Sequence, residues 1–177
     1  RQSIKLTKDI VDSVKKNKYK HEVIIFPPHI YLGQTQNINR NNIIKIGSQN
    51  VSAYNNGAYT GEISASMLKD SKIKYCLVGH SERRHIMNES DAECSEKALR
   101  LYENNIKIIY CIGETLTEYK SKKTKSVLKK QIKYLFKKIG KQINKKPNNI
   151  IFAYEPVWAI GTGLVPSSDE LLLTFDF

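Results

Sequence analysis

One glutamate and one histidine stand directly after apolar segments of the chain. Glu155 ends an apolar run that begins at Ile150, and Pro156 follows it, where a strand cannot continue. His80 follows the apolar run 75–78 and a glycine. In a barrel of parallel strands, residues at the carboxyl ends of strands face one site. A carboxylate without a metal partner suits proton abstraction, and an imidazole can donate a hydrogen bond to a developing oxyanion.

The residues after Glu155 predict a loop that closes over a ligand. Gly161 and Gly163 lie between Pro156 and Pro166, which predicts stiff ends and a mobile middle. The free N–H groups of such a loop suit a phosphate. A base, an electrophile and an anion site together fit proton abstraction next to a carbonyl group.

Other site chemistries fit the same residues poorly. His80 and His85 are five positions apart, a poor zinc spacing on a helix, and no H-E-x-x-H pattern is present. The segment 161–163 precedes Pro166 and does not form the dinucleotide pattern G-x-G-x-x-G. A lone strand-end glutamate is more often a surface acid, and a lone histidine before serine is more often structural. We expect no metal and no cofactor.

Strands and helices alternate along the chain. The expected strands cover residues 23–26, 43–47, 75–78, 106–111 and the run from 150 to the Pro156 boundary, which we expect to be buried. Three expected helices cover residues 4–16, 30–36 and 64–68. Two more begin with caps at Ser90 and Ser167. A further helix is lysine-rich, with apolar residues at positions 128, 132, 135 and 139. Strict alternation indicates an α/β fold with a parallel sheet, but does not distinguish a doubly wound sheet from a barrel.

Positive charge is concentrated in one part of the chain. The net charge is +12 over 177 residues, yet the segment from Lys120 to Lys146 holds twelve lysines and no acid, and the rest is close to neutral. A basic amphipathic helix can bind a membrane surface or a protein partner. We favour a solvated lysine face on an outer helix, and we expect neither nucleic acid nor a membrane as partner.

The cysteines indicate a reducing compartment. Cys76, Cys94 and Cys111 are odd in number and form no C-x-x-C pair, and two of them lie in apolar strands. We interpret them as buried free thiols and expect a cytoplasmic protein. No apolar run approaches the roughly eighteen residues that a membrane span needs.

Six segments, in order, resemble the triosephosphate isomerase family. They are Phe26-Pro27-Pro28, Ser48-Gln49-Asn50, residues 57–64 (GAYTGEIS), residues 79–84 (GHSERR), residues 111–114 (CIGE) and residues 154–163 (YEPVWAIGTG). The resemblance implies a (β/α)8 TIM barrel, with residues 1–177 as one domain that covers about strands two to six. A whole barrel typically has about 250 residues, so we expect this chain to be a piece of one.

The resemblance also implies a reaction in glycolysis and gluconeogenesis. Glu155 resembles the base that moves a proton between neighbouring carbons of dihydroxyacetone phosphate, which gives glyceraldehyde 3-phosphate. His80 resembles the neutral electrophile that polarises the carbonyl group. A helix beginning at His80 would disfavour the imidazolium through its dipole. The Gly161 N–H resembles the group that reaches the substrate phosphate.

Further residues match supporting parts of the family site. The supporting positions are Ser81, Glu82 and Arg83. The lid loop comprises Pro156, Val157, Trp158, Ala159, Ile160, Thr162 and Gly163 around Gly161. The loop that inserts into a partner subunit comprises Tyr59, Thr60, Gly61 and Glu62, so a homodimer is implied.

The resemblance leaves some positions unmatched. The family's first strand supplies an asparagine and a substrate-binding lysine, and its last two strands supply phosphate contacts; no segment of 1–177 matches these strands. Asn88 stands where the family usually has glycine. An inactive remnant or a basic binding protein is the alternative function, and another phosphate-binding barrel is a more distant one.

Overall fold

Five parallel strands form one sheet in the computed structural model, which describes residues 2–143 and 147–176. The strands are β1 (Ile24–Ile25), β2 (Lys45–Ser48), β3 (Tyr75–Val78), β4 (Lys107–Ile112) and β5 (Ile150–Tyr154). The helices are α1 (Gln2–Asn17), α2 (Leu32–Ile38), α3 (Ala65–Asp70), α4 (Ser81–His85), α5 (Asp91–Glu103), α6 (Leu116–Lys120), α7 (Thr124–Ile143) and α8 (Ser168–Phe175). Short 3-10 turns cover His29–Tyr31, Pro147–Asn149 and Val157–Ala159.

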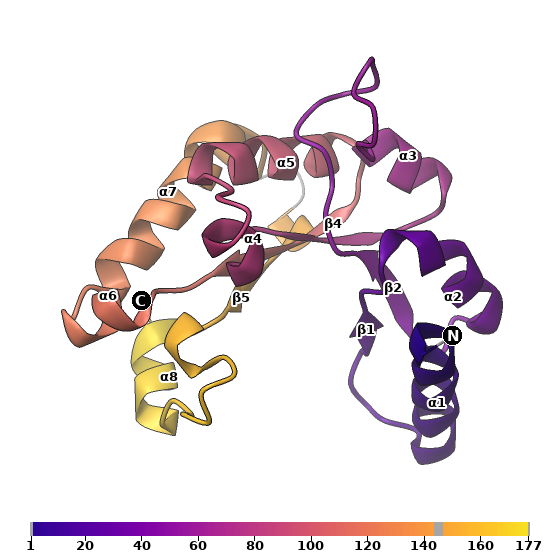
Figure 1. The fold of residues 1–177 in the computed structure, drawn as a ribbon, viewed down its shortest axis with the longest axis horizontal. Coiled ribbons are helices and arrows are strands. Elements are labelled where there is room, and N and C mark those ends of the chain that lie inside the picture. Colours follow the sequence, from indigo (N-terminus) through magenta and orange to yellow (C-terminus); the bar gives the residue numbers. More distant parts are fainter. Residues whose placement is uncertain (1, 144–146, 177) are drawn as a thin grey trace.

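The strand order decides between the two α/β architectures. The order is β1-β2-β3-β4-β5, and every neighbouring pair is parallel. A doubly wound sheet reverses its order at a switch point, whereas a barrel adds each strand beside the last. The sheet is also curved, with the helices on its outer side (Figure 1). The fold is therefore α/β, with the order and curvature of part of a TIM barrel.

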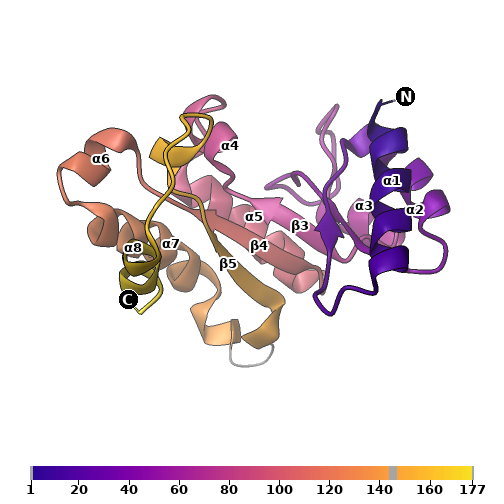
Figure 2. The ribbon, with the colours of Figure 1, turned by 90° about the horizontal axis from the view of Figure 1, so that it is seen from below.

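The core lies between the sheet and the outer helices. Helix α5 buries Cys94, Ala98 and Leu101 against β3 and β4. Helix α7 packs on α5 and buries Leu128, Leu135 and Ile139, with Ile132 partly buried. Figure 2 shows both helices on the same face of β4 and β5. Within the lysine-rich segment, residues 124–143 thus form an outer helix with an apolar stripe, as predicted. Lys120 ends α6 instead, and residues 144–146 lie outside the described residues.

Local sequence signals set the helix boundaries as expected. The side chain of Ser64 accepts a hydrogen bond from Met67 N–H, and that of Ser90 accepts one from Glu93 N–H. Ser167 and Glu170 form a reciprocal capping box at the start of α8. Helix α5 ends at Glu103, before the two asparagines that the sequence marks as its stop. Strand β3 has the predicted bounds.

Two expectations about strands need correction. The first strand pairs over Ile24–Ile25 alone, because the prolines that follow residue 26 end the ladder early. The prediction that the last strand is buried is wrong: Ile151 and Phe152 are 42% and 39% exposed. Strand β5 is an edge strand of the described sheet, so no further strand covers these side chains.

All three cysteines are buried and free, as predicted. Burial raises the pKa of the Cys76 thiol to about 12 and that of the Cys94 thiol to about 11. These thiols are therefore protonated near neutral pH. Among the described helices, none is both long enough and apolar enough to cross a membrane.

Candidate active site

His80 lies at the junction between β3 and α4. Gly79 before it has φ +71°, and a Cβ there would lie 2.6 Å from Arg84 Nη2, so the turn requires glycine. His80 is the N-cap residue of α4, and its Nδ1 accepts a hydrogen bond from the Glu82 N–H at 3.4 Å. An accepting Nδ1 leaves the proton of the neutral imidazole on Nε2.

Glu155 lies at the carboxyl end of β5, where β4 supports its backbone. Its N–H donates to the Ile112 carbonyl oxygen at 2.8 Å. Its own carbonyl oxygen comes so close to Gly113 that a Cβ at Gly113 would lie 1.8 Å from it. Glycine at position 113 is therefore required by packing, because any side chain there would push the Glu155 backbone away from the end of β4.

The structure brings the predicted base and electrophile together. His80 Nε2 lies 3.5 Å from Glu155 Oε1, and their side chains are 32% and 20% exposed. The buried Ser81 donates its N–H to Glu155 Oε2 at 3.0 Å. Burial, followed by the nearby Glu155 charge, raises the pKa of the Cys111 thiol. The pair therefore has one face on solvent and one face on the buried end of the sheet.

A cavity of about 350 Å³ opens beside His80. It is lined by His29, Gln49, Asn50, Leu77, His80, Glu82, Arg83 and Met87. His29 Nε2 lies 3.0 Å from the Asn50 carbonyl oxygen and 2.6 Å from Ser48 Oγ, which fixes the loop after β2 against the turn after β1. The cavity therefore has a wall of polar groups held by hydrogen bonds.

Arg83, one of the predicted supporting residues, forms an ion pair with a buried ionic cluster that sequence reasoning did not predict. Arg83 Nε lies 3.1 Å from Glu89 Oε1, and Glu89 also binds Lys97. Lys97 Nζ donates to Asn50 Oδ1 at 3.1 Å, and its side chain is 3% exposed. Burial lowers the pKa of Lys97 to about 8. The cluster ties α4 and α5 to the cavity wall at Asn50, whereas Glu82 is exposed.

Arg84 belongs to the motif GHSERR, but the prediction gave it no role. Its guanidinium donates to the Gly79 carbonyl oxygen at 2.7 Å and to the Cys111 carbonyl oxygen at 3.2 Å. It also pairs with Asp91 Oδ1 at 2.7 Å, at the start of α5. These contacts fasten the end of β3, which carries His80, to the end of β4.

The loop after Glu155 is held at its start by Glu114, another residue that sequence reasoning missed. Glu114 is fully buried and accepts hydrogen bonds from Trp158 Nε1 at 3.0 Å, Tyr154 OH at 3.0 Å and Thr124 Oγ1 at 3.1 Å. The Val157 N–H donates to the Glu114 carbonyl oxygen at 3.1 Å. The segment CIGE could have marked Glu114 as a strand-end acid in the same way that Glu155 was marked.

The two glycines in the middle of the predicted lid have open space around them. Gly161 and Gly163 have φ of +71° and +78°, and nothing lies within 4 Å of a Cβ built at either. Thr162 Oγ1 donates to the Trp158 carbonyl oxygen at 2.9 Å, which closes the first turn of the loop. Among the described residues, no hydrogen bond joins residues 157–165 to His80 or Glu155.

The predicted partner-binding loop is exposed and contains a stacked aromatic pair. Tyr54 and Tyr59 have ring centroids 4.4 Å apart, with an angle of 11° between their planes. Thr60 and Glu62 are exposed, and Gly61 has φ +90°. The loop projects from the body above α3 and α5 (Figure 1). Asn88 adopts φ +56°, a left-handed conformation that asparagine tolerates better than most residues. Glycine adopts this conformation readily, which fits the glycine that the resembling family usually has at this position.

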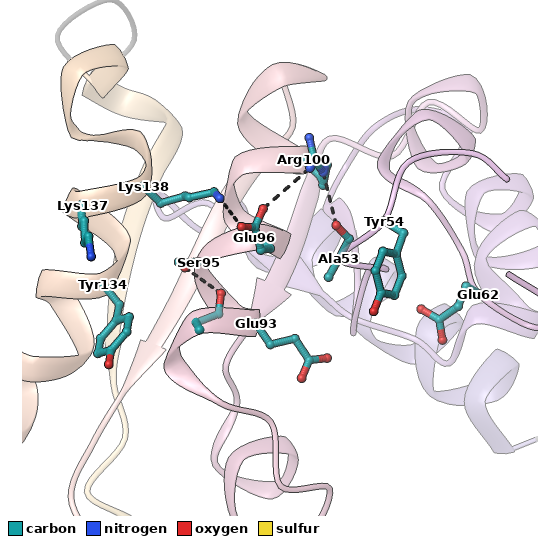
Figure 3. Close-up of a pocket in the computed structure, with 11 residues that line it drawn as sticks. Ala53, Tyr54, Glu62, Glu93, Ser95, Glu96, Arg100, Tyr134, Lys137 and Lys138 are labelled. Atoms are coloured by element: carbon teal, nitrogen blue, oxygen red, sulfur yellow. Dashed lines mark hydrogen bonds and ion pairs between the residues drawn. The ribbon is translucent and has the colours of Figure 1, made fainter.

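A larger cavity, of about 950 Å³, has neither His80 nor Glu155 among its lining residues (Figure 3). Its walls come from α5, α7 and the exposed loop. Glu96 pairs with Arg100 within α5 and with Lys138 on α7. Glu62 is the one predicted residue among its lining residues. The described part of the chain holds no group of histidine, cysteine and acidic side chains suited to a metal ion.

The sequence matches one protein family over nearly its whole length. The family model described as triosephosphate isomerase matches residues 1–175. The chain is 41% identical to the triosephosphate isomerase of Alkaliphilus oremlandii over 164 residues, which are 92% of this chain and 65% of that protein.

Two further relatives agree with this match. The chain is 39% identical to the triosephosphate isomerase of Clostridium tetani over 170 residues, 96% of this chain and 64% of that protein. It is 46% identical to the triosephosphate isomerase of Psychromonas ingrahamii over 149 residues, 84% of this chain and 58% of that protein. The chain thus spans less than two thirds of the length of these relatives. The chain belongs to the triosephosphate isomerase family.

Proposed function

We propose that the protein carrying this chain interconverts dihydroxyacetone phosphate and D-glyceraldehyde 3-phosphate. The observation that supports this most strongly is the 3.5 Å approach of His80 Nε2 to Glu155 Oε1, at the ends of β3 and β5 in a triosephosphate isomerase family chain. A carboxylate and an imidazole N–H that face each other at strand ends form a base and an electrophile for one substrate.

The proposed reaction moves one proton between neighbouring carbons. The Glu155 carboxylate removes a proton from the carbon beside the carbonyl group, and the electrons of that C–H bond form the double bond of an enediolate. The carbonyl oxygen takes up the negative charge, and the His80 Nε2–H stabilises it by a hydrogen bond. Glu155 then returns the proton to the neighbouring carbon. A second proton passes from the hydroxyl oxygen of the first carbon to the former carbonyl oxygen, which leaves an aldehyde on the first carbon and a hydroxyl group on the second. Because the Glu82 N–H donates to Nδ1, the neutral imidazole with its proton on Nε2 is the form that fits this role.

Substrate binding has to move the carboxylate. A separation of 3.5 Å leaves no room for a substrate carbon between His80 and Glu155, and the Ser81 N–H holds the carboxylate in the described position. Glu155 directly precedes the loop that starts at Pro156. Movement of this loop would therefore carry the carboxylate away from Ser81 and toward the substrate.

The loop 156–166 acts in this proposal as a lid. Its side chains Ile160, Leu164 and Val165 are 52%, 53% and 84% exposed, although they are apolar. Closure over the substrate would bury them, bring the Gly161 N–H to the phosphate and exclude water from the enediolate.

We also propose that the protein is a homodimer. The apolar side chains Ile30, Ile86 and Met87 are 80%, 68% and 63% exposed, and Met87 lines the cavity beside His80. Exposed apolar groups beside a cavity are typical of a protein interface. The loop with Tyr59 to Glu62 of a second copy is the occupant that we propose. We expect Met87→Glu to produce monomers in sedimentation measurements, and an unchanged dimer would contradict this placement.

We place this reaction in glycolysis and gluconeogenesis, in the cytoplasm. The buried, free thiols of Cys76, Cys94 and Cys111 support a reducing compartment.

Solvent deuterium exchange tests the proposed reaction. With dihydroxyacetone phosphate in D2O, the wild-type protein should form glyceraldehyde 3-phosphate, and mass spectrometry should find deuterium on the carbon that receives the proton. Deuterium uptake would support transfer through an exchangeable group such as a carboxylate, and conversion at the wild-type rate in Glu155→Gln would contradict proton transfer through Glu155. Binding of the substrate with no conversion would favour the alternative of a non-catalytic protein.

A further inference from the structure

One tyrosine on α6 contacts the start of the loop 156–166. The Tyr119 ring stacks on the Trp158 ring, with centroids 4.3 Å apart and an angle of 24° between their planes. Trp158 is 7% exposed, and its Nε1 is fixed by Glu114. The ring of Tyr119 therefore forms one wall around the side chain that anchors the beginning of the loop.

The same tyrosine contacts the end of the loop. Its hydroxyl group donates a hydrogen bond to Glu170 Oε1. The other oxygen of Glu170 accepts the N–H of Ser167 at 2.8 Å and its hydroxyl at 2.9 Å, which is the cap that starts α8. The hydrogen bond to Glu170 raises the pKa of Tyr119, and the bond from Tyr119 lowers the pKa of Glu170.

The two contacts meet around one small cavity of about 160 Å³. Its lining includes Glu114, Tyr119, Trp158, Pro166 and Glu170. Tyr119 is itself fixed, because the capping box of Thr115 and Glu118 starts α6 and the Tyr119 N–H donates to the Thr115 carbonyl oxygen at 2.9 Å. The tyrosine is thus a stationary group between two ends of an exposed loop.

Other contacts in this region reach one end of the loop each. Glu114 binds Trp158 at the start of the loop, and Ser167 binds Glu170 at its end. Tyr154 also approaches α8, but it contacts the ring of Phe175 in the last turn, with centroids 6.3 Å apart. Among these groups, Tyr119 contacts both Trp158 and Glu170.

We propose that Tyr119 is a positioning residue that couples the two ends of the loop 156–166, so that they are held or released together. The ring holds the start of the loop through Trp158, and the hydroxyl holds its end through Glu170. The inference rests on the proposed function, in which this loop is the lid. If the two ends of the loop are coupled, the lid moves as one rigid body, and neither end is released before the other.

The test changes one end of the loop and observes the other. The intact protein is labelled with 5-fluorotryptophan, and the 19F resonance that Trp158→Phe removes is assigned to Trp158. Glu170→Ala should shift or broaden this resonance, although the substitution lies at the far end of the loop. In the Tyr119→Phe background, which keeps the stacked ring and removes the hydroxyl, Glu170→Ala should cause no further change.

Controls make the result specific. Tyr134→Phe removes the hydroxyl of an exposed tyrosine on α7 (Figure 3) and should leave both the resonance and its response to Glu170→Ala unchanged. The proposal is overturned if Glu170→Ala leaves the Trp158 resonance in place, or if it shifts the resonance equally with and without the Tyr119 hydroxyl.

The readout separates this inference from the proposed function. A protein with coupled ends and no isomerase activity would contradict the proposed reaction alone. An active isomerase whose Trp158 resonance ignores Glu170→Ala would contradict the role of Tyr119 alone.

Discussion

The two sides of the proposed catalytic pair, His80 and Glu155, are built differently. His80 follows β3, whose residues Tyr75, Cys76 and Val78 are at most 3% exposed. Glu155 follows β5, whose residues Ile151 and Phe152 are about two fifths exposed at 42% and 39%. The proposed electrophile thus extends from the middle of the sheet, and the proposed base extends from its described edge. A hydrogen-bond donor has to be fixed before the charge develops, whereas in the proposed mechanism Glu155 moves to reach the substrate.

The supporting contacts follow the same division. Around His80, Arg84 and the cluster of Glu89 and Lys97 join three elements through buried ionic contacts. After Glu155, the loop has contacts at its two ends, and its middle is exposed. We infer that the β3 side supplies rigidity and that the β5 side supplies motion.

The largest effect on stability should come from the buried cluster. Lys97→Met leaves the buried Glu89 with Arg83 as its remaining ionic partner, and we expect a loss of about 3 kcal/mol in the free energy of unfolding. Urea denaturation measures it. Lys133→Met, at an exposed position on α7, is the matched control and should change stability by less than about 0.5 kcal/mol. Equal effects at both lysines would show that the β3 side is not specially fixed.

A smaller loss should follow from crowding at the junction of the two sides. Gly113→Ala places a methyl group against the Glu155 carbonyl oxygen, and we expect a loss of about 2 kcal/mol because the backbone must move. Thermal unfolding measures this change. In contrast, Gly33→Ala in α2 meets nothing within 4 Å and should stabilise by up to about 1 kcal/mol. A neutral Gly113→Ala would refute the close contact between β4 and Glu155.

On the β5 side, the anchor of the loop should contribute less. Trp158→Phe removes the hydrogen bond to Glu114 and keeps an aromatic ring beside Tyr119, so we expect a loss of about 1.5 kcal/mol. Chemical denaturation followed by circular dichroism gives the value. A loss as large as that of Lys97→Met would remove the proposed contrast between the two sides.

The smallest effect should occur in α8. Leu172 is 60% exposed, so Leu172→Ala removes few contacts, and we expect a change within about 0.5 kcal/mol. The same denaturation experiment applies. A change above 2 kcal/mol would mean that this side chain is covered in the folded protein.

Sequence reasoning succeeded where the signal is local. The bounds of β3 follow from one apolar run, and the start of α8 follows from serine and glutamate at capping distance. The pairing of His80 with Glu155 also follows from local signals, because both residues end strands of one parallel sheet. These features depend on a few neighbouring residues or on a general rule of the fold.

It failed where a residue's role depends on distant partners. Lys97 reads as one of many lysines, and its burial depends on Glu89 and Asn50 meeting it across two loops. Arg84 reads as an ordinary helix residue, and its contact with the Cys111 carbonyl oxygen depends on strand order. The exposure of β5 depends on what lies beside it, which its apolar sequence cannot show.

The most direct test of the account is the turnover of Glu155→Asp in the intact protein. The shorter side chain withdraws the carboxylate by about 1 Å, so we expect kcat to fall about a hundredfold while KM changes little. Glu103→Asp makes the same chemical change at an exposed position on α5 and should leave both constants unchanged. Steady-state kinetics that show wild-type turnover for Glu155→Asp would remove Glu155 from the role of base, and with it the central claim.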